Sequence, residues 1–94
     1  MYKIIIVSYD ISASLYERNV LDLRVVDEIF DSIKEAKEYV NEYLIDDLKV
    51  EACQGEVSPD DIEVECIEDK EKVRLNALYD DTYIQVYECW IVEE

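Results

Sequence analysis

Apolar side chains recur every three or four residues between positions 33 and 49, and this spacing predicts an amphipathic helix. Ser32 and Glu35 form the pattern of a capping box, and Asp31 adds negative charge at the positive end of the helix. We therefore expect a helix from Ile33 to about Lys49. Its apolar stripe consists of Ile33, Ala36, Val40, Tyr43, Leu44 and Leu48.

Two strands are predicted before this helix. Residues 2–9 are mostly β-branched or aromatic with little alternation, which is typical of a central strand covered on both faces. Residues 10–19 resemble a connecting loop. In residues 20–30 the apolar positions change parity near Val25 and Val26, which predicts a strand with a bulge at that point.

Three further strands are predicted after the helix. Residues 50–61 contain Gly55, Ser58 and Pro59 and form a long connection. Residues 62–67 alternate, with Ile62, Val64 and Cys66 pointing inward, and residues 68–71 form a polar turn. Residues 73–79 form the next strand, and Asp80-Asp81 is a tight hairpin. The last strand, 82–92, has two apolar faces: Ile84, Val86, Trp90 and Val92 on one, and Tyr83, Tyr87, Cys89 and Ile91 on the other.

The predicted element order is β-β-α-β-β-β, within one acidic domain spanning residues 1–94. The expected fold is α+β: an antiparallel sheet of about five strands with one amphipathic helix packed on one face. Because the last strands are apolar on both faces, one helix cannot cover the whole sheet. We therefore expect the open face to contact a partner or a second copy of the chain.

The charge balance narrows the choice of partner. The chain has 25 acidic and 9 basic residues, which gives a net charge of −16. Direct binding of nucleic acid or of an anionic membrane requires positive charge, so neither is expected. A basic protein is the favoured partner, because long-range attraction accelerates its capture. Solubility alone needs only about 2–8 net charges.

Acidic residues are most frequent between positions 46 and 71. On a strand, Asp61, Glu63 and Glu65 would form a row that could imitate a phosphate backbone. The alternative is a solvated sheet edge whose charge prevents aggregation. Tyrosine is also frequent and is enriched at binding sites, although ordinary packing would explain it as well. The candidate partner-binding residues are Asp46, Asp47, Glu56, Asp60, Asp61, Glu63, Glu65, Glu68, Asp69, Tyr83 and Tyr87.

Candidate chemistry is sparse. The chain has no histidine, which excludes Ser–His and Cys–His nucleophile pairs. Its three cysteines have no metal-binding or redox spacing and are expected to be reduced thiols in a cytoplasmic protein. We expect no catalytic residues, no metal and no cofactor.

A metal-dependent nuclease is a weaker alternative. Pro59-Asp60 followed by Glu68-Asp69-Lys70 resembles the nuclease pattern in which two carboxylates hold magnesium. However, Glu35-Ala36-Lys37 and Asp47-Leu48-Lys49 fit the same tripeptide, and a nuclease needs a basic surface for its substrate.

The chain resembles small acidic phage-encoded inhibitors of bacterial defences, above all the anti-CRISPR proteins. The likeness is carried by length, charge, the acidic run 46–71, the tyrosines and the Ser-capped helix within residues 26–48. It implies a stoichiometric inhibitor that occupies a basic nucleic-acid-binding cleft of a defence protein, and it assigns no role to any residue. The alternative hypothesis is a protein–protein interaction module or homodimeric accessory protein that uses the open sheet face.

Overall fold

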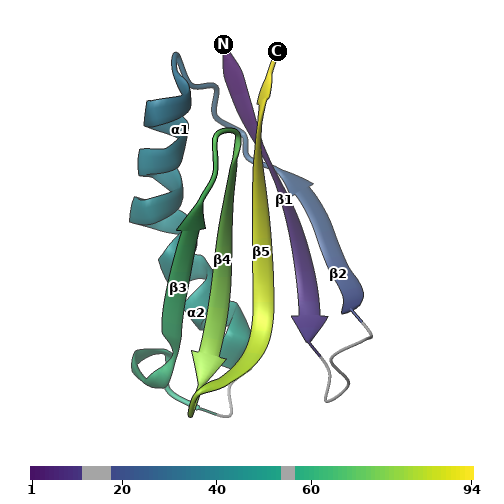
Figure 1. Cartoon of the computed structure of the whole chain (residues 1–94), viewed down its shortest axis with the longest axis vertical. Coiled ribbons are helices and arrows are strands. Elements are labelled where there is room, and N and C mark those ends of the chain that lie inside the picture. The colour runs from purple at the N-terminus through teal and green to yellow at the C-terminus, as the bar shows by residue number, and fades with distance from the viewer. Residues whose placement is uncertain (12–17, 54–56) are drawn as a thin grey trace.

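The computed structural model contains one open antiparallel sheet of five strands in the order β2-β1-β5-β4-β3 (Figure 1). The strands are β1 (Tyr2–Ile11), β2 (Arg18–Val25), β3 (Glu63–Glu68), β4 (Lys72–Tyr79) and β5 (Thr82–Glu93). The structure describes residues 1–11, 18–53 and 57–94, and the side chains of 10–11 and 18–22 are not among those described. The predicted α+β class and element order are confirmed.

The first and last strands are neighbours at the centre of the sheet. β1 pairs with β5 from Tyr2 opposite Glu93 to Asp10 opposite Gln85, so both chain ends lie at the same end of the sheet (Figure 1). The Glu94 amide donates to the Met1 carbonyl at 2.8 Å, and Lys3 Nζ lies 2.8 Å from a Glu94 carboxylate oxygen. The long-range β1–β5 pairing therefore closes the fold.

A helical segment without a break runs from Ile33 to Cys53 and lies on one face of the sheet (Figure 1). It consists of α1 (Ile33–Tyr39), the π-helical turn η1 (Val40–Leu44) and α2 (Ile45–Cys53). Ser32 Oγ accepts from the Glu35 amide at 3.2 Å, which confirms the predicted N-cap. The helix continues four residues beyond the predicted end at Lys49.

The π-helical turn has a reason in the sequence. Five buried residues recur at intervals of four: Ala36, Val40, Leu44, Leu48 and Ala52. A regular α-helix turns about 100° per residue, so each interval of four rotates the stripe by about 40°. One π-helical turn absorbs about one residue and returns the later positions to the sheet. Tyr43, placed in the stripe by the prediction, is instead 56% exposed.

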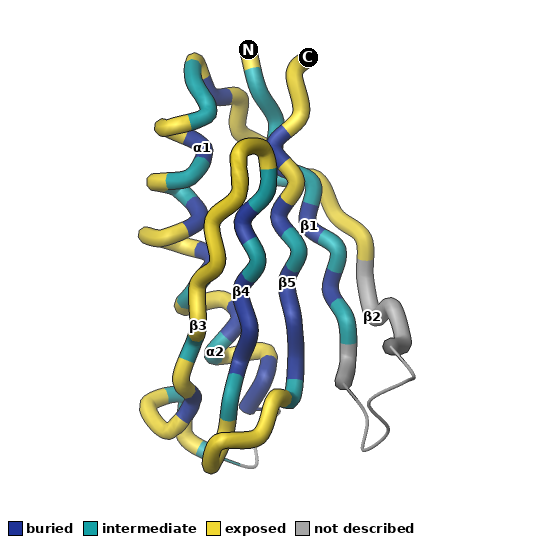
Figure 2. Tube along the Cα trace, viewed as in Figure 1, coloured by how far each residue is buried: buried dark blue, intermediate teal, exposed yellow. Residues whose placement is uncertain are grey.

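The core lies between the helix and one face of the sheet; buried positions alternate along β1, whereas β4 and β5 each contain three consecutive buried residues, 75–77 and 85–87 (Figure 2). The strands contribute Ile4, Ile6, Val73, Leu75, Ala77, Tyr87, Cys89 and Ile91 to this core. Two buried polar side chains share it, because Gln85 Nε2 donates to Ser8 Oγ at 3.1 Å. Among the described elements only the helix lies against a face of β1, and the positions of β1 on the other face are half-buried, so the predicted cover on both faces is not found in the described part of the chain.

Two bulges set which side chains face the helix. Ser8 pairs with Asp22 but Tyr9 pairs with Val20, so the extra residue of β2 is Leu21 rather than Val25 or Val26 as predicted. In β5, Ala77 pairs with Gln85 but Leu78 pairs with Tyr83. This second bulge, at Ile84, shifts Tyr83 to the face opposite Tyr87.

The connections agree in part with the prediction. Asp80 and Asp81 have φ values of 50° and 62°, so the hairpin between β4 and β5 is confirmed as a tight turn of two left-handed residues. The predicted loop 10–19 is wrong at both ends, because β1 continues to Ile11 and β2 begins at Arg18; the remaining residues, 12–17, lie outside the described part of the chain. Within the described ranges, no helix has the length and apolarity required to cross a membrane.

Candidate functional site: the uncovered face of the sheet

The sheet face opposite the helix carries most of the exposed apolar side chains. Strand register places six of the eleven exposed large apolar residues among the described ones on this open face. They are Leu23, Val25, Ile67, Tyr83, Trp90 and Val92. The other five are scattered over the N-terminus, the loop before the helix, the helix itself and the Tyr79 end of β4. The open face is therefore the main exposed apolar surface of the described chain.

One line of side chains crosses four strands of this face, toward the end of the sheet where both termini lie. Val25 on β2 lies opposite Ile5 on β1, Ile5 lies opposite Trp90 on β5, and Trp90 lies opposite Lys72 on β4. Lys72 Nζ stands 4.8 Å from the centroid of the Trp90 ring, which is within cation–π range. Trp90 is 42% exposed and Val25 is 53% exposed. The face therefore carries one apolar row with a cation at its end.

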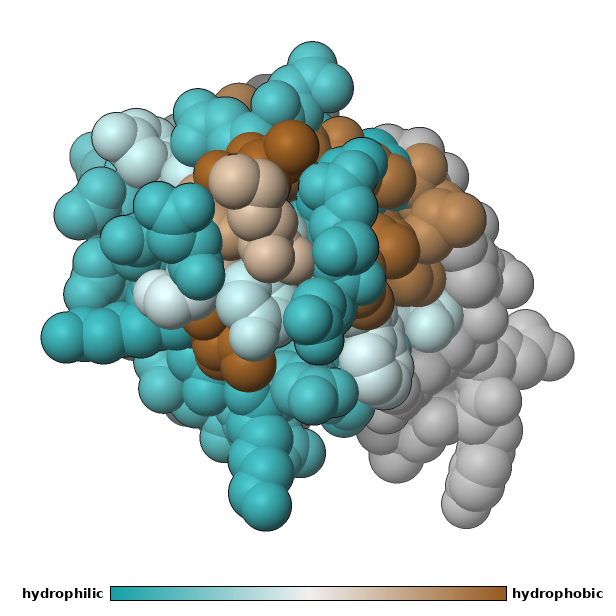
Figure 3. All heavy atoms as spheres, turned by 90° about the horizontal axis from the view of Figure 1, so that it is seen from above, coloured by the Kyte–Doolittle hydropathy of each residue, from teal (hydrophilic) through white to brown (hydrophobic). Residues whose placement is uncertain are grey.

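Hydrophobic residues also gather toward the end of the molecule where both termini lie. Viewed from above, they form groups that are flanked and separated by hydrophilic residues (Figure 3). Trp90 and Lys72 also line a shallow hollow of about 380 Å³ with Asp69, Lys70 and Glu71. The β3–β4 turn thus supplies charged side chains around the exposed indole.

The β3–β4 half of the open face is polar and already hydrogen-bonded. Arg74 Nε donates to Asn76 Oδ1 at 3.1 Å, and Asn76 Nδ2 donates to a Glu65 oxygen at 3.3 Å. The Tyr83 hydroxyl donates to the other Glu65 oxygen at 3.2 Å. The Glu65 carboxylate stabilises the protonated phenol, so the pKa of Tyr83 is raised. Glu65 is therefore part of an ordered network.

The open face is balanced in charge. Among the described strand residues it carries the bases Lys3, Lys72 and Arg74 and the acids Glu63, Glu65 and Glu88, which sum to zero. The net charge of −16 therefore belongs to the rest of the chain. Arg74 and Glu88 lie directly opposite each other on β4 and β5. Charges of both signs are thus neighbours on this face.

The predicted acidic run is divided among separate elements. Asp46 and Asp47 lie in the first turn of α2, and Asp60 and Asp61 lie in the 3-10 turn η2 (Pro59–Asp61). Glu63 and Glu65 follow on β3, and Glu68 and Asp69 lie at the far end of that strand. Glu56 lies outside the described residues.

The expected row of Asp61, Glu63 and Glu65 is interrupted. Asp61 precedes the strand, and Ile67 follows Glu65 on the open face. Three more members of the run have partners elsewhere in the chain: Asp47 pairs with Arg24 at 3.7 Å, Asn41 donates to Glu68 at 3.4 Å, and Lys37 Nζ donates to the Asp69 carbonyl at 2.5 Å. The run forms no single anionic ridge along the described strands.

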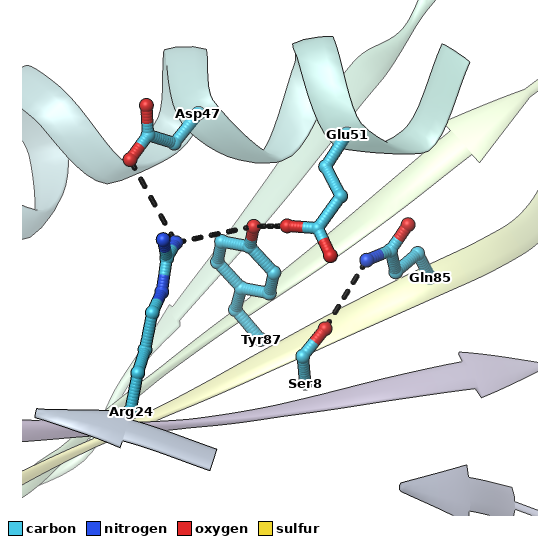
Figure 4. A network of polar contacts seen from close by, with 6 residues as sticks. All are labelled: Ser8, Arg24, Asp47, Glu51, Gln85 and Tyr87. Atoms are coloured by element: carbon cyan, nitrogen blue, oxygen red, sulfur yellow. Dashed lines mark hydrogen bonds and ion pairs between the residues drawn. The ribbon is translucent and has the colours of Figure 1, made fainter. Parts of the chain in front are cut away.

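The prediction that Tyr83 and Tyr87 share a partner-binding face is wrong. Tyr83 lies on the open face and is 43% exposed, whereas Tyr87 has no exposed surface. The Tyr87 hydroxyl donates to Glu51 of α2, and Arg24 Nη2 donates to that hydroxyl at 3.4 Å (Figure 4). Arg24 also reaches Asp47 and lies 5.6 Å from the Tyr87 ring centroid. This network joins the helix to the sheet.

The nuclease pattern does not converge. Asp60 precedes β3 and Glu68 ends it, so the two residues are more than about 15 Å apart along the strand. Among the described residues, no group of three His, Cys, Asp or Glu side chains is arranged to hold a metal ion. The residues of the proposed magnesium site therefore cannot share one ion.

Cys53, Cys66 and Cys89 are free thiols, in agreement with the expectation that they are unpaired. Cys53 and Cys89 are buried, whereas Cys66 lies on the helix-facing side of the edge strand β3, as predicted, and is nevertheless exposed. Burial raises the pKa of the Cys89 thiol to about 12. Burial and the neighbouring Glu68 also raise the pKa of Cys66. Raised pKa values make both thiols weak nucleophiles at neutral pH.

Sequence reasoning omitted from the candidate site three residues of the row on the open face, namely Ile5, Lys72 and Trp90. The usable signal was the last strand, where Trp90 and Val92 share a face while Cys89 and Ile91 share the other. No protein-family model matches the chain, and neither a curated protein nor a solved structure matches it. The open face is therefore the feature on which a function can be argued.

Proposed function

We propose that this protein is a protein-binding module that docks its partner on the open face of the sheet. The observation that supports this most directly is the apolar row Val25–Ile5–Trp90, bordered by Lys72. Exposing apolar side chains in a contiguous group is unfavourable in water, and such groups commonly mark interaction surfaces.

Trp90 is the expected anchor of this interface. Tryptophan is among the residues most enriched at binding hot spots, and its indole offers a large apolar surface on this face. The polar network of Arg74, Asn76, Glu65 and Tyr83 would form the rim on one side. An apolar centre with a polar rim is the usual anatomy of a specific interface.

The experiment compares two variants of the full chain for association with any protein, including a second copy. Trp90→Glu changes the open face, and Tyr43→Glu changes an exposed aromatic residue on the helix side. We expect Trp90→Glu to abolish association, measured by chemical cross-linking of the purified chain and by capture from bacterial lysate. Tyr43→Glu should retain it. Association that is lost equally in both variants, or in neither, would contradict the proposal.

A second candidate function is inhibition of a basic nucleic-acid-binding protein by imitation of its phosphate ligand. The specific observation in favour is an exposed acidic series on the helix, formed by Glu35, Glu38, Glu42 and Asp46 at intervals of three or four residues. Carboxylates at this spacing would meet Arg and Lys side chains that otherwise contact phosphates.

The two candidates differ in their dependence on salt and in the residues they need. Inhibition by imitation predicts capture of a nucleic-acid-binding protein, loss of that capture between about 50 and 500 mM salt, and loss in Glu38→Lys with Glu42→Lys. Binding through the open face predicts tolerance of both changes. Capture that survives high salt and the double variant would exclude imitation by the helix.

A further inference from the structure

We infer that the occupant of the open face is a second copy of the same chain, stacked face to face about a two-fold axis. This inference rests on the proposed function, because it names the partner of the same surface. A two-fold interface brings one patch against itself, so the patch must be complementary to itself.

The distribution of charge on the open face meets this requirement. Arg74 and Glu88 are directly opposite each other on neighbouring strands, and the face carries three acids and three bases. A second copy can therefore place its acids near these bases and its bases near these acids. A basic partner would instead meet Lys72 and Arg74 within the interface, where like charges are unfavourable.

Face-to-face stacking also keeps the strongly acidic parts of two copies apart. The helix lies on the opposite side of the sheet and carries exposed acids from Glu35 to Glu51. With about 10 Å for each packed layer, the two helices of a stacked pair would be roughly 30 Å apart. The Debye length is about 8 Å at physiological salt, so repulsion across that distance is largely screened.

The area of the face suits a stable pair. Five strands at about 4.8 Å spacing and roughly eight residues long cover about 600 Å² of sheet. Because side chains protrude from the sheet, the accessible area of the face is larger than this flat area. It therefore approaches the roughly 800 Å² per partner of a standard interface. Aligned packing of two sheets at about −30° would bury the Val25–Ile5–Trp90 row of each copy.

The chain provides its own reporter, because Trp90 is its single tryptophan. We expect sedimentation equilibrium of the purified full chain to show a monomer–dimer equilibrium. Over the same concentration range, Trp90 emission should shift to shorter wavelength and acrylamide quenching should decrease as the indole is buried. These two measurements need no variant, so a folding defect of a variant cannot affect them.

Two matched substitutions locate the interface. Val25→Lys changes the open face and Val50→Lys changes α2, and both start from a valine that is more than half exposed, at 53% and 62%. Each adds the same charge. We expect Val25→Lys to weaken dimerisation by about tenfold or more, and Val50→Lys by less than about twofold.

Three outcomes would overturn the inference. The first is a monomer at every accessible concentration with unchanged Trp90 emission, and the second is a dimer that is indifferent to Val25→Lys. The third is a monomer that captures a different protein in a Trp90-dependent manner. That third result would reject the second copy as occupant and leave the proposed function intact. Association that does not depend on Trp90, whether with a second copy or with another protein, would reject both the dimer and the proposed function.

Discussion

The hydroxyl of Tyr87 donates a hydrogen bond to the carboxylate of Glu51 and so links the centre of the sheet to α2. Tyr87 is buried, and its ring packs in the core beside the helix. Arg24 of the edge strand β2 joins the same group through Tyr87 and Asp47. These contacts hold the helix over one face and thereby decide that the other face stays open.

Replacing Tyr87 with phenylalanine should test this link. The change removes the hydroxyl but keeps the ring, so we expect the free energy of unfolding to fall by about 1–2 kcal/mol. The measurement is urea unfolding followed by circular dichroism. Glu51→Gln retains an acceptor and should cost less. Equal stability of Tyr87→Phe and the parent chain would show that the hydrogen bond contributes nothing net.

The β4–β5 turn should be improved by glycine. Asp81 adopts a left-handed backbone with φ of 62°, which glycine reaches without the steric cost that a side chain brings. We expect Asp81→Gly to increase the free energy of unfolding by about 0.5–1 kcal/mol. The comparison is Asp60→Gly, a substitution in a turn where no positive φ occurs, which should not stabilise the chain. A loss of stability in Asp81→Gly would contradict the prediction.

The three cysteines should differ in reactivity. Cys66 is exposed and the other two are buried, so a disulfide reagent should modify one thiol in the folded protein and three after denaturation. Because burial and Glu68 raise the pKa of Cys66, its rate should be low at pH 7 and should increase up to and beyond pH 9. Glu68→Gln removes one of the two causes of the raised pKa and should accelerate modification of Cys66 at pH 8. Rapid reaction of all three native thiols would contradict the burial pattern.

Alkaline pH should destabilise the fold through Cys89. Its folded pKa of about 12 exceeds the value of 9.0 of an unperturbed thiol, so only the unfolded chain ionises between these pH values. The contribution of Cys89 to the free energy of unfolding is therefore complete below pH 9. It is lost as the pH increases toward 12, at about 1.4 kcal/mol per pH unit.

The measurement is the free energy of unfolding as a function of pH from 8 to 11. Cys89→Ala lowers stability at every pH because it leaves a small cavity, but its slope above pH 9 should be shallower than that of the parent chain. Parallel slopes for the two proteins would exclude Cys89 as the titrating group.

The sequence predicted an element correctly where contacts between residues close together in the chain determine it. Ser32 and Glu35 lie three residues apart, so their contact depends only on local geometry, and the cap is present as expected. Asp80-Asp81 likewise forms the expected turn. By contrast, the bulge at Ile84 depends on how β4 pairs with β5, and this pairing separates Tyr83 from Tyr87. Simple alternation along the strand had placed these two residues on one face.

The sequence predicted only part of the candidate site. An apolar second face was expected from the last strand, but apart from Tyr83 and Tyr87 the candidate residues were chosen from the acidic run. Charge is conspicuous in a sequence, whereas the row Val25–Ile5–Trp90–Lys72 joins residues far apart along the chain. Only strand register brings these four side chains into one line.

By itself, the sequence determined the helix, its cap, the turns, the α+β class and the net charge, because each follows from short-range periodicity or from composition. The tertiary structure decided where that charge lies and which face of the sheet the helix covers. Both outcomes depend on long-range pairings such as β1 with β5, and local residue patterns do not specify the partner of a strand.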